Sequence, residues 1–291
     1  MTDSSNAALI ARAERAEQGS YLLLFAPALL LVGLFLGGPL GLLFFQSLRE
    51  GDSFSFVHYA RIWQEEIYWR TYADTLQISL LVTVLSIVFG FPLAYAAAVA
   101  SRGWSTLILA LVMLPFWTSV LVRTYAWLVV LQRRGIINTT LIDLGIIEKP
   151  LSLSHNFTAV LIGMLHVMIP FMVFPLYAAL SKIPTELTQA GHSLGGSTFY
   201  VFRRIILPLA APGVAAGSVL VFILCLGFYL TPELLGGGKT IMVSSLVQRN
   251  VELYLQFGAA SAVAMVLLAM VCTIFWAVDR ALPVEKIVGM R

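Results

Sequence analysis

Residues 156–181 read NFTAVLIGMLHVMIPFMVFPLYAALS and contain no Asp, Glu, Lys or Arg. A helix crosses the ~30 Å hydrocarbon core of a bilayer with about 20 mostly apolar residues, because each residue adds ~1.5 Å and lipid offers backbone groups no hydrogen bonds. The stretch is therefore predicted to be a transmembrane helix. Charge-free windows of similar length predict five more such helices, at residues 21–45, 75–100, 103–122, 205–232 and 253–278.

The composition of the whole chain agrees with these windows. Of its 291 residues, 59% are apolar and only 11% are charged, against about 25% charged residues in a typical soluble domain. The net charge is +3, and no Lys or Arg run resembles a phosphate-binding stripe. The composition therefore argues against a soluble enzyme, a nucleic-acid binder and a secreted disulfide scaffold.

The sequence thus predicts an all-α, polytopic membrane protein with six transmembrane helices in one domain. The predicted domain covers residues 21–280, between an N-terminal tail at 1–20 and a C-terminal tail at 281–291. An even number of spans places both termini on one side. The two sides carry nearly equal numbers of Lys and Arg, so the positive-inside rule favours cytoplasmic termini only weakly.

The loop after the fourth window predicts two short helices joined by a turn. Pro184 suits the first turn of a helix, where its missing N–H costs nothing. Glu186 complements the positive end of the helix dipole. Gly195 and Gly196 can adopt the positive φ that ends a helix, and Ser197 or Thr198 can cap the next one.

The first of these helices has one apolar face with very small residues at its centre, formed by Leu187, Ala190, Gly191 and Leu194. Small residues allow another surface to approach the backbone closely, which favours a docking element. The alternative is a helix that rests on lipid headgroups, although such helices ordinarily carry Trp, Phe or Lys at the boundary. The residues by themselves leave both interpretations open.

The order of residues in this loop resembles a known family. Gln189-Ala190-Gly191, then Gly195, then Ile206-Leu207-Pro208 is similar to the EAA loop of permease subunits in binding-protein-dependent ABC importers. Gln189 and Gly191 stand where that pattern has Glu and Ala. The Gln keeps the size of a Glu and loses its charge, so a salt bridge made by the usual Glu is not expected here.

Four more stretches resemble the spermidine/putrescine-type permeases of that family. They are FGFPLAY at 89–95, LPFWTSVLVRTY at 114–125, PFMVFPLY at 170–177 and LGGGK at 235–239. The resemblance implies a type I ABC importer permease fold in the bacterial inner membrane. It also implies a cytoplasmic loop at 182–207 and, with it, two cytoplasmic termini.

The resemblance implies a transport subunit that depends on other proteins for energy. The expected partners are an ABC ATPase dimer, a second and different permease, a periplasmic solute-binding protein and membrane lipid, without nucleic acid. ATP and Mg²⁺ would be used by the ATPases, and no cofactor, metal or catalytic residue is expected in this chain. The sequence accordingly contains no Walker lysine loop, no G-x-S-x-G and no H-E-x-x-H motif.

The solute implied by the resemblance is a polyamine such as spermidine or putrescine. An opine, an amino-acid derivative or a phosphonate is the alternative, because related permeases share the scaffold and differ in solute. An intramembrane enzyme is a poorer interpretation, since the six windows contain no Asp, Glu, Lys or Arg. The predicted docking loop also argues against a self-sufficient channel.

Two sets of site residues follow. The ATPase-coupling set, taken from its position in the loop, comprises Glu186, Gln189, Ala190, Gly191, Gly195 and Pro208. The candidate solute-path set comprises polar, charged and aromatic residues close to the outer ends of the spans: Asp74, Trp117, Arg123, Tyr125, Tyr229 and Glu233.

Each member of the solute-path set also has a structural interpretation. Arg123 follows a segment that Pro115 is expected to break, and its head could reach the outer interface. Asp74 and Glu233 could be solvated loop charges, and the aromatic residues could be packing residues. His166 is predicted to form a hydrogen bond inside the helix bundle, in preference to a role as a proton relay.

Overall fold

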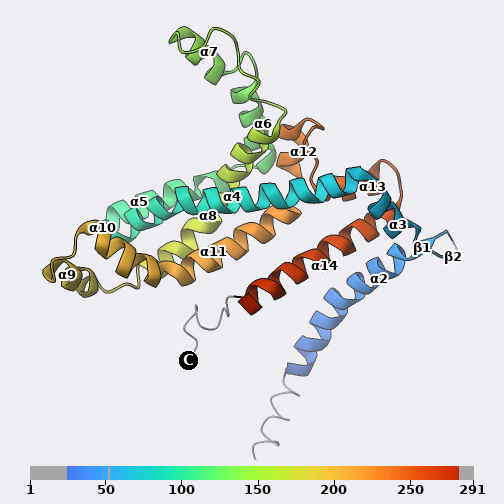
Figure 1. The fold of residues 1–291 in the computed structure, drawn as a ribbon, viewed down its shortest axis with the longest axis horizontal. Coiled ribbons are helices and arrows are strands. Elements are labelled where there is room, and N and C mark those ends of the chain that lie inside the picture. Colours follow the sequence, from blue (N-terminus) through green and yellow to red (C-terminus); the bar gives the residue numbers. More distant parts are fainter. Residues whose placement is uncertain (1–24, 52, 282–291) are drawn as a thin grey trace, which may run out of the picture.

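The computed structural model describes residues 25–51 and 53–281 (Figure 1). The predicted tail at 1–20, and all but the first residue of that at 281–291, lie outside the described residues. The regular secondary structure of the described residues is helical except for a hairpin of two short strands, β1 (Arg49–Glu50) and β2 (Ser53–Phe54). Its helices are α2 (Gly38–Ser47), α3 (Val57–Gln64), α4 (Glu66–Val99), α5 (Arg102–Met113), α6 (Val120–Leu131), α7 (Ile136–Asp143), α8 (Phe157–Leu180), α9 (Thr185–Ser193), α10 (Thr198–Val201), α11 (Leu207–Gly227), α12 (Leu230–Gly236), α13 (Val243–Glu252) and α14 (Phe257–Ala281).

Five of the six predicted spans are single helical segments. Each is long and apolar enough to cross a membrane: Phe25–Ser47, Glu66–Val99, Phe157–Leu180, Thr198–Gly227 and Phe257–Ala277. The first and fourth of these segments include the π turns Gly33–Gly37 and Phe202–Ile206. The all-α, polytopic membrane fold predicted from the sequence is confirmed.

The third predicted span, at 103–122, is not one continuous helix, and it breaks at Pro115 as expected. α5 ends at Met113, a 3-10 turn covers Leu114–Trp117, and α6 begins at Val120. The two halves of this segment are bent by 95°. Pro115 lies in the turn, where it has no N–H to donate and its ring disfavours a continued α-helix. The 12 residues of α5 are too few to cross the bilayer by themselves.

Two other predicted boundaries also move. α4 begins at Glu66, so Asp74 lies within the helix and not at its start. The fifth span ends at Gly227 because Phe228 adopts an extended conformation. Residues 230–232 of the predicted window therefore belong to α12, a separate short helix.

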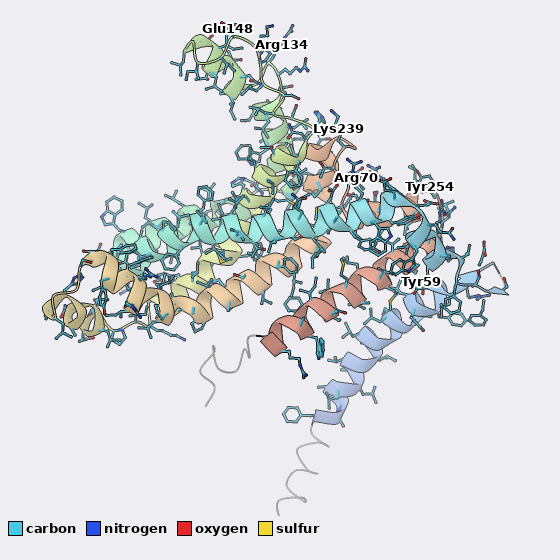
Figure 2. All side chains as sticks on the ribbon, in the orientation of Figure 1. Tyr59, Arg70, Arg134, Glu148, Lys239 and Tyr254 are labelled. Atoms are coloured by element: carbon cyan, nitrogen blue, oxygen red, sulfur yellow. The ribbon has the colours of Figure 1, made fainter. Side chains whose placement is uncertain are left out.

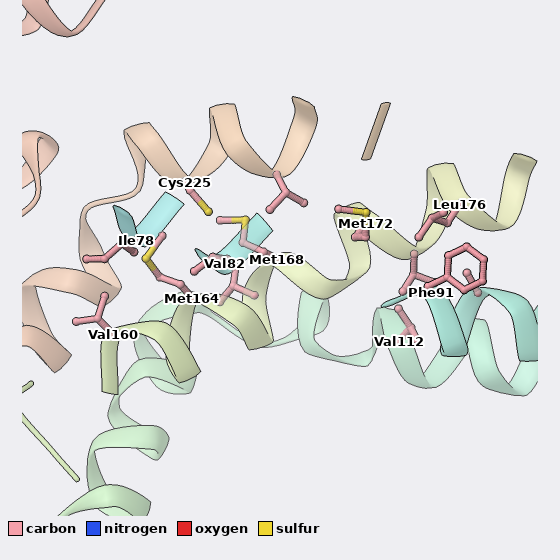
Figure 3. Close-up of a cluster of buried hydrophobic side chains, with 14 of the residues drawn as sticks. Ile78, Val82, Phe91, Val112, Val160, Met164, Met168, Met172, Leu176 and Cys225 are labelled. Carbon is pink, nitrogen blue, oxygen red and sulfur yellow. The ribbon is translucent and has the colours of Figure 1, made fainter. Parts of the chain in front are cut away.

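The main core lies where α4, α8 and α11 pack against one another. Its side chains include three methionines of α8 spaced by four residues, Met164, Met168 and Met172, with Ile78 and Val82 of α4 (Figure 3). Unbranched methionine side chains fill irregular gaps between helices.

Glycines set the close approach of these helices. A Cβ at Gly213 of α11 would lie 2.6 Å from Ala179 Cβ and 2.8 Å from Pro175 O of α8, and one at Gly217 would lie 2.7 Å from Met172 Sδ. On α4, a Cβ at Gly90 would lie 3.1 Å from Met172 Cγ. Small residues give membrane helices van der Waals contact where lipid provides no hydrophobic drive for association.

A second, smaller core joins α3, α4, α13 and α14 near the opposite end of α4 from α9. Its buried residues are Ile62, Tyr68, Tyr72, Val243, Ala262 and Val263. The Tyr72 hydroxyl donates a 2.8 Å hydrogen bond to the Val263 carbonyl. α2 packs on α14 at the edge of the molecule (Figure 1). In the most hydrophobic 18-residue stretch of the span that contains α2, 0% of the residues are buried.

The predicted outer loops lie away from the loop at 182–204. The labelled residues Tyr59, Arg70, Lys239 and Tyr254 lie toward the opposite end of the bundle from α9, and Arg134 lies on the arm formed by α6 and α7 (Figure 2). The predicted outer loops and the loop at 182–204 therefore lie on different sides of the bundle.

The glycine contacts generate a prediction about stability. Gly213→Val is expected to lower the free energy of unfolding by about 1–3 kcal/mol, because Pro175 O belongs to the backbone and has little room to move. The thermal unfolding midpoint of the purified protein in detergent measures the effect.

Gly41→Val in α2 is the matched control. It carries the same change in helix propensity, and a Cβ at Gly41 would have nothing within 4 Å. Equal losses in the two variants would show that the α8–α11 contact does not limit stability.

Candidate functional site

The loop between α8 and α11 is a helix, a tight turn and a second helix. Leu194 is the C-cap of α9, and Gly195 follows with φ +84°. The Gly195 N–H donates to His192 O at 2.9 Å, and the Gly196 N–H donates to Gly191 O at 3.0 Å. These two bonds form a Schellman motif, which the predicted positive φ at Gly195 makes possible.

The second helix of the loop begins as predicted. Ser197 is the N-cap of α10, and its hydroxyl oxygen accepts a 3.3 Å hydrogen bond from the Tyr200 N–H. The turn is thus fixed by backbone and side-chain hydrogen bonds on both sides. Such a connection holds α9 and α10 at a defined angle.

Gly191 does not lie at the centre of an open face. A Cβ at this position would lie 2.8 Å from Ile205 Cδ1 and 3.0 Å from Val201 Cγ2. Gly191 therefore lets α9 pack against the second half of its own loop. The small residues correctly predicted that another surface approaches Gly191 closely, but that surface was predicted to belong to another protein. Helical periodicity defines a face without identifying the neighbour that covers it.

The outward surface of the loop includes large apolar and aromatic side chains. Leu194 is 90% exposed, and Leu187, Phe199 and Tyr200 are exposed as well. The predicted coupling residues Glu186, Gln189, Ala190 and Pro208 are also exposed. Phe199 and Tyr200 are not among the predicted coupling residues, although large aromatic residues close after a predicted N-cap, on a short helix, indicate exposed side chains.

A cavity of about 640 Å³ lies behind this loop. Tyr95, Ala98 and Val99 line it from α4, and α9 contributes Thr185, Thr188 and His192. This cavity therefore separates α9 from the end of α4.

The candidate solute-path residues come from four separate elements. Trp117, in the 3-10 turn, is 79% exposed, and Tyr125 of α6 is also exposed. The side of α6 that meets the protein is a different one. It carries Thr124, whose hydroxyl lies 3.1 Å from that of Thr231 in α12.

Arg123 and His166 lie where α6 meets α8. Trp127 Nε1 donates a 3.0 Å hydrogen bond to His166 Nδ1, which confirms the prediction that His166 is hydrogen-bonded within the bundle. Within the described residues, the Nε and Nη1 atoms of Arg123 are buried and lack a hydrogen-bond partner. Unpaired buried donors are costly, so an acceptor from another molecule would stabilise this position.

Glu233 is paired inside the chain. Its carboxylate accepts a 2.6 Å hydrogen bond from Arg249 Nη2 of α13, and each side chain is 30% exposed. It is therefore neither a free solvated carboxylate nor one available to a cation in this conformation. Asp74 is half-buried within α4, and Tyr229 is the N-cap residue of α12.

The six candidate solute-path residues lie outside two cavities of the described chain. A second cavity, of about 340 Å³, is lined by residues of α4, α5 and α8 with Pro115. None of the six lines this cavity or the one behind the loop. By contrast, the loop residues of the coupling set are adjacent in the structure.

Comparison with known proteins agrees with this architecture. The spermidine/putrescine transport system permease protein PotB of Haemophilus influenzae is 33% identical over 242 residues, covering 80% of this chain and 84% of the relative. PotB of Escherichia coli is 30% identical over 272 residues, covering 90% and 94%. The inner membrane ABC transporter permease protein YdcU of Escherichia coli is 36% identical over 176 residues, covering 56% of each chain.

Two solved structures have the same fold. A bacterial ABC transporter involved in the import of the acidic polysaccharide alginate matches with a TM-score of 0.67 at 20% identity, over 92% of this chain and 99% of that one. The MetNI methionine ABC transporter matches with a TM-score of 0.55 at 18% identity, over 80% and 97%. Residues 78–280 match the family described as binding-protein-dependent transport system inner membrane component. The chain belongs to this family of ABC importer permeases, and it is a multi-pass protein of the inner membrane.

Proposed function

We propose that this chain is a permease subunit of an ABC importer that moves a polyamine, such as spermidine or putrescine, into the cytoplasm. The observation that carries the proposal is the similarity to PotB, which extends over 90% of the chain at 30% identity. The exposed helix–turn–helix loop between α8 and α11 supports it, because a permease without catalytic groups needs a contact through which it receives energy.

The loop is suited to passing on a displacement. Its two ends continue into α8 and into the helical segment of α11, and the Schellman motif stiffens the turn between them. Closure of the ATPases around ATP would bind one position of the loop better than the other, and so shift the permease between inward-facing and outward-facing states.

The remaining components belong to the same proposal. An ABC ATPase dimer would bind ATP and Mg²⁺, a second, different permease would complete the pore, and a periplasmic binding protein would deliver the solute. This chain would contribute no catalytic residue and no cofactor. With the loop facing the ATPases, both termini are cytoplasmic.

One observation favours a different solute. The buried Nε and Nη1 atoms of Arg123 have no acceptor among the described residues, and a guanidinium attracts carboxylates and phosphonates and repels ammonium groups. If Arg123 faces the solute, an opine, an amino-acid derivative or a phosphonate fits better than a polyamine.

The proposed solute is tested by transport. The complex is reconstituted in liposomes with its ATPase, second permease and binding protein, and uptake of radiolabelled spermidine and putrescine is measured with ATP inside. Uptake that depends on ATP and on the binding protein is expected. Uptake of an opine or a phosphonate, with none of either polyamine, would overturn the assignment.

The turn of the coupling loop is tested at Gly195. Gly195→Val is expected to abolish ATP-driven uptake while leaving membrane insertion intact, since a β-branched residue disfavours φ +84° and would reorient α9. Gly145→Val is the matched control: Gly145 has φ +70° and equally open surroundings, and it directly follows the C-cap of α7. Loss of uptake in both variants, or in neither, would contradict a coupling role for this turn.

Substitutions in the ion pair of Glu233 with Arg249 test whether the Glu233 carboxylate has a structural role or binds the solute. Glu233→Gln and Arg249→Gln are each expected to reduce uptake, and the exchange Glu233→Arg with Arg249→Glu is expected to restore most of it. The pair is expected to contribute about 1 kcal/mol or less, because both groups are partly exposed. Failure of the exchanged pair to restore uptake, with normal assembly, would favour direct contact between Glu233 and a cationic solute.

A further inference from the structure

The segment that joins α10 to α11 carries an aromatic contact with α4. The ring of Phe202 meets that of Phe91 at a centroid distance of 5.5 Å and an interplanar angle of 81°, and that of Tyr95 at 6.3 Å and 85°. Edge-to-face arrangements of this kind are favoured by the ring quadrupoles. Phe91 and Tyr95 are four residues apart, so Phe202 contacts two successive turns on one face of α4.

The backbone around Phe202 explains how its ring reaches α4. Phe202–Ile206 form a π turn, in which each turn holds more residues than in an α-helix. Val201, which precedes the π turn, and Ile206, its last residue, are buried, while Arg203 and Arg204 are exposed. The π turn thus directs the apolar residues inward and both charges outward.

Phe202 contacts α4 at a place where α9 does not. The cavity of about 640 Å³ lies between α9 and the end of α4, and Phe202 itself lines this cavity. α9 has no buried residue. The edge-to-face contacts of Phe202 are therefore a direct mechanical connection from the loop to α4, across a region that is otherwise open.

The contact meets α4 beside its internal proline. Pro92 follows Phe91 inside the helix and has no N–H to donate to the carbonyl of Val88. Helices bend preferentially at such positions. A force applied through Phe91 therefore acts beside the part of α4 that bends at the least cost.

We propose that Phe202 is the positioning residue that transmits movement of the coupling loop to α4. The proposal rests on the proposed function, since it requires ATPases that move the loop. Phe202 directly follows α10, so displacement of α10 moves its ring, and the ring moves α4 at Phe91 and Tyr95. The covalent ends of the loop reach α8 and α11, which themselves pack along α4, and the Phe202 contact reaches α4 directly from the loop.

The test compares uptake with ATP hydrolysis in the reconstituted complex. Phe202→Ala is expected to lower the number of solute molecules taken up per ATP hydrolysed by about tenfold, a typical coupling between distant sites, while hydrolysis stimulated by the binding protein continues. Phe202→Tyr is expected to keep the wild-type ratio, because the ring remains. Co-purification of all subunits confirms assembly, and Phe202→Leu, which retains bulk without a ring, replaces the alanine variant if that complex does not assemble.

Two further variants identify the contact. Phe91→Ala is expected to lower the ratio as Phe202→Ala does, and the double variant is expected to be no worse than either single one. Phe222→Ala is the matched control, because Phe222 lies on α11 and makes an edge contact with Phe275 at 6.4 Å, away from the loop. It is expected to leave the ratio unchanged.

A wild-type ratio in Phe202→Ala, a parallel fall in uptake and hydrolysis, or an equal fall in Phe222→Ala would overturn the proposal. A wrong assignment of the solute would give a different result. The wild-type complex would then take up no polyamine, and the ratios would be measured with the solute that the binding protein delivers.

Discussion

The close contact of α8 with α11 is the interaction on which the rest of the molecule depends. Gly213 and Gly217 bring α11 against the backbone of α8, and the methionines of α8 fill the space between these helices and α4. In lipid this fit, and not hydrophobic burial, holds helices together. Because the coupling loop connects these two helices, the same contact fixes where the loop emerges. A displacement of the loop is therefore applied to the best-packed part of the structure.

The broken third span solves a different problem. At the 3-10 turn that contains Pro115, after the end of α5, the chain turns by 95° and continues in α6, which no longer runs with the bundle. Polar contacts anchor α6 in place of helix-long packing: Trp127 bonds His166 on α8, and Thr124 lies beside Thr231 on α12. Hydrogen bonds between membrane helices contribute modestly and are directional. They leave one face of α6, with Tyr125, exposed for a neighbouring molecule.

The charged residues Arg123 of α6 and Glu233 of α12 differ in whether they have a partner in the described chain. Glu233 and Arg249 neutralise each other, whereas Arg123 has two buried nitrogens without a partner in the described chain. Unpaired buried donors are costly, so an acceptor from outside the described chain would stabilise Arg123. The coupling loop, in contrast, is complete within one chain, down to its Schellman turn and its N-cap.

The sequence by itself determined the helical membrane fold, since a charge-free window of sufficient length has no other stable state in lipid. It also determined the start and turn of the coupling loop, where Pro184, Gly195 and Ser197 act through local backbone geometry. The tertiary structure alone decided that Gly191 faces Val201 and Ile205, that Glu233 meets Arg249, and that Phe202 reaches α4. Those contacts join residues whose neighbours depend on how whole helices pack, and helical periodicity defines a face without saying what covers it.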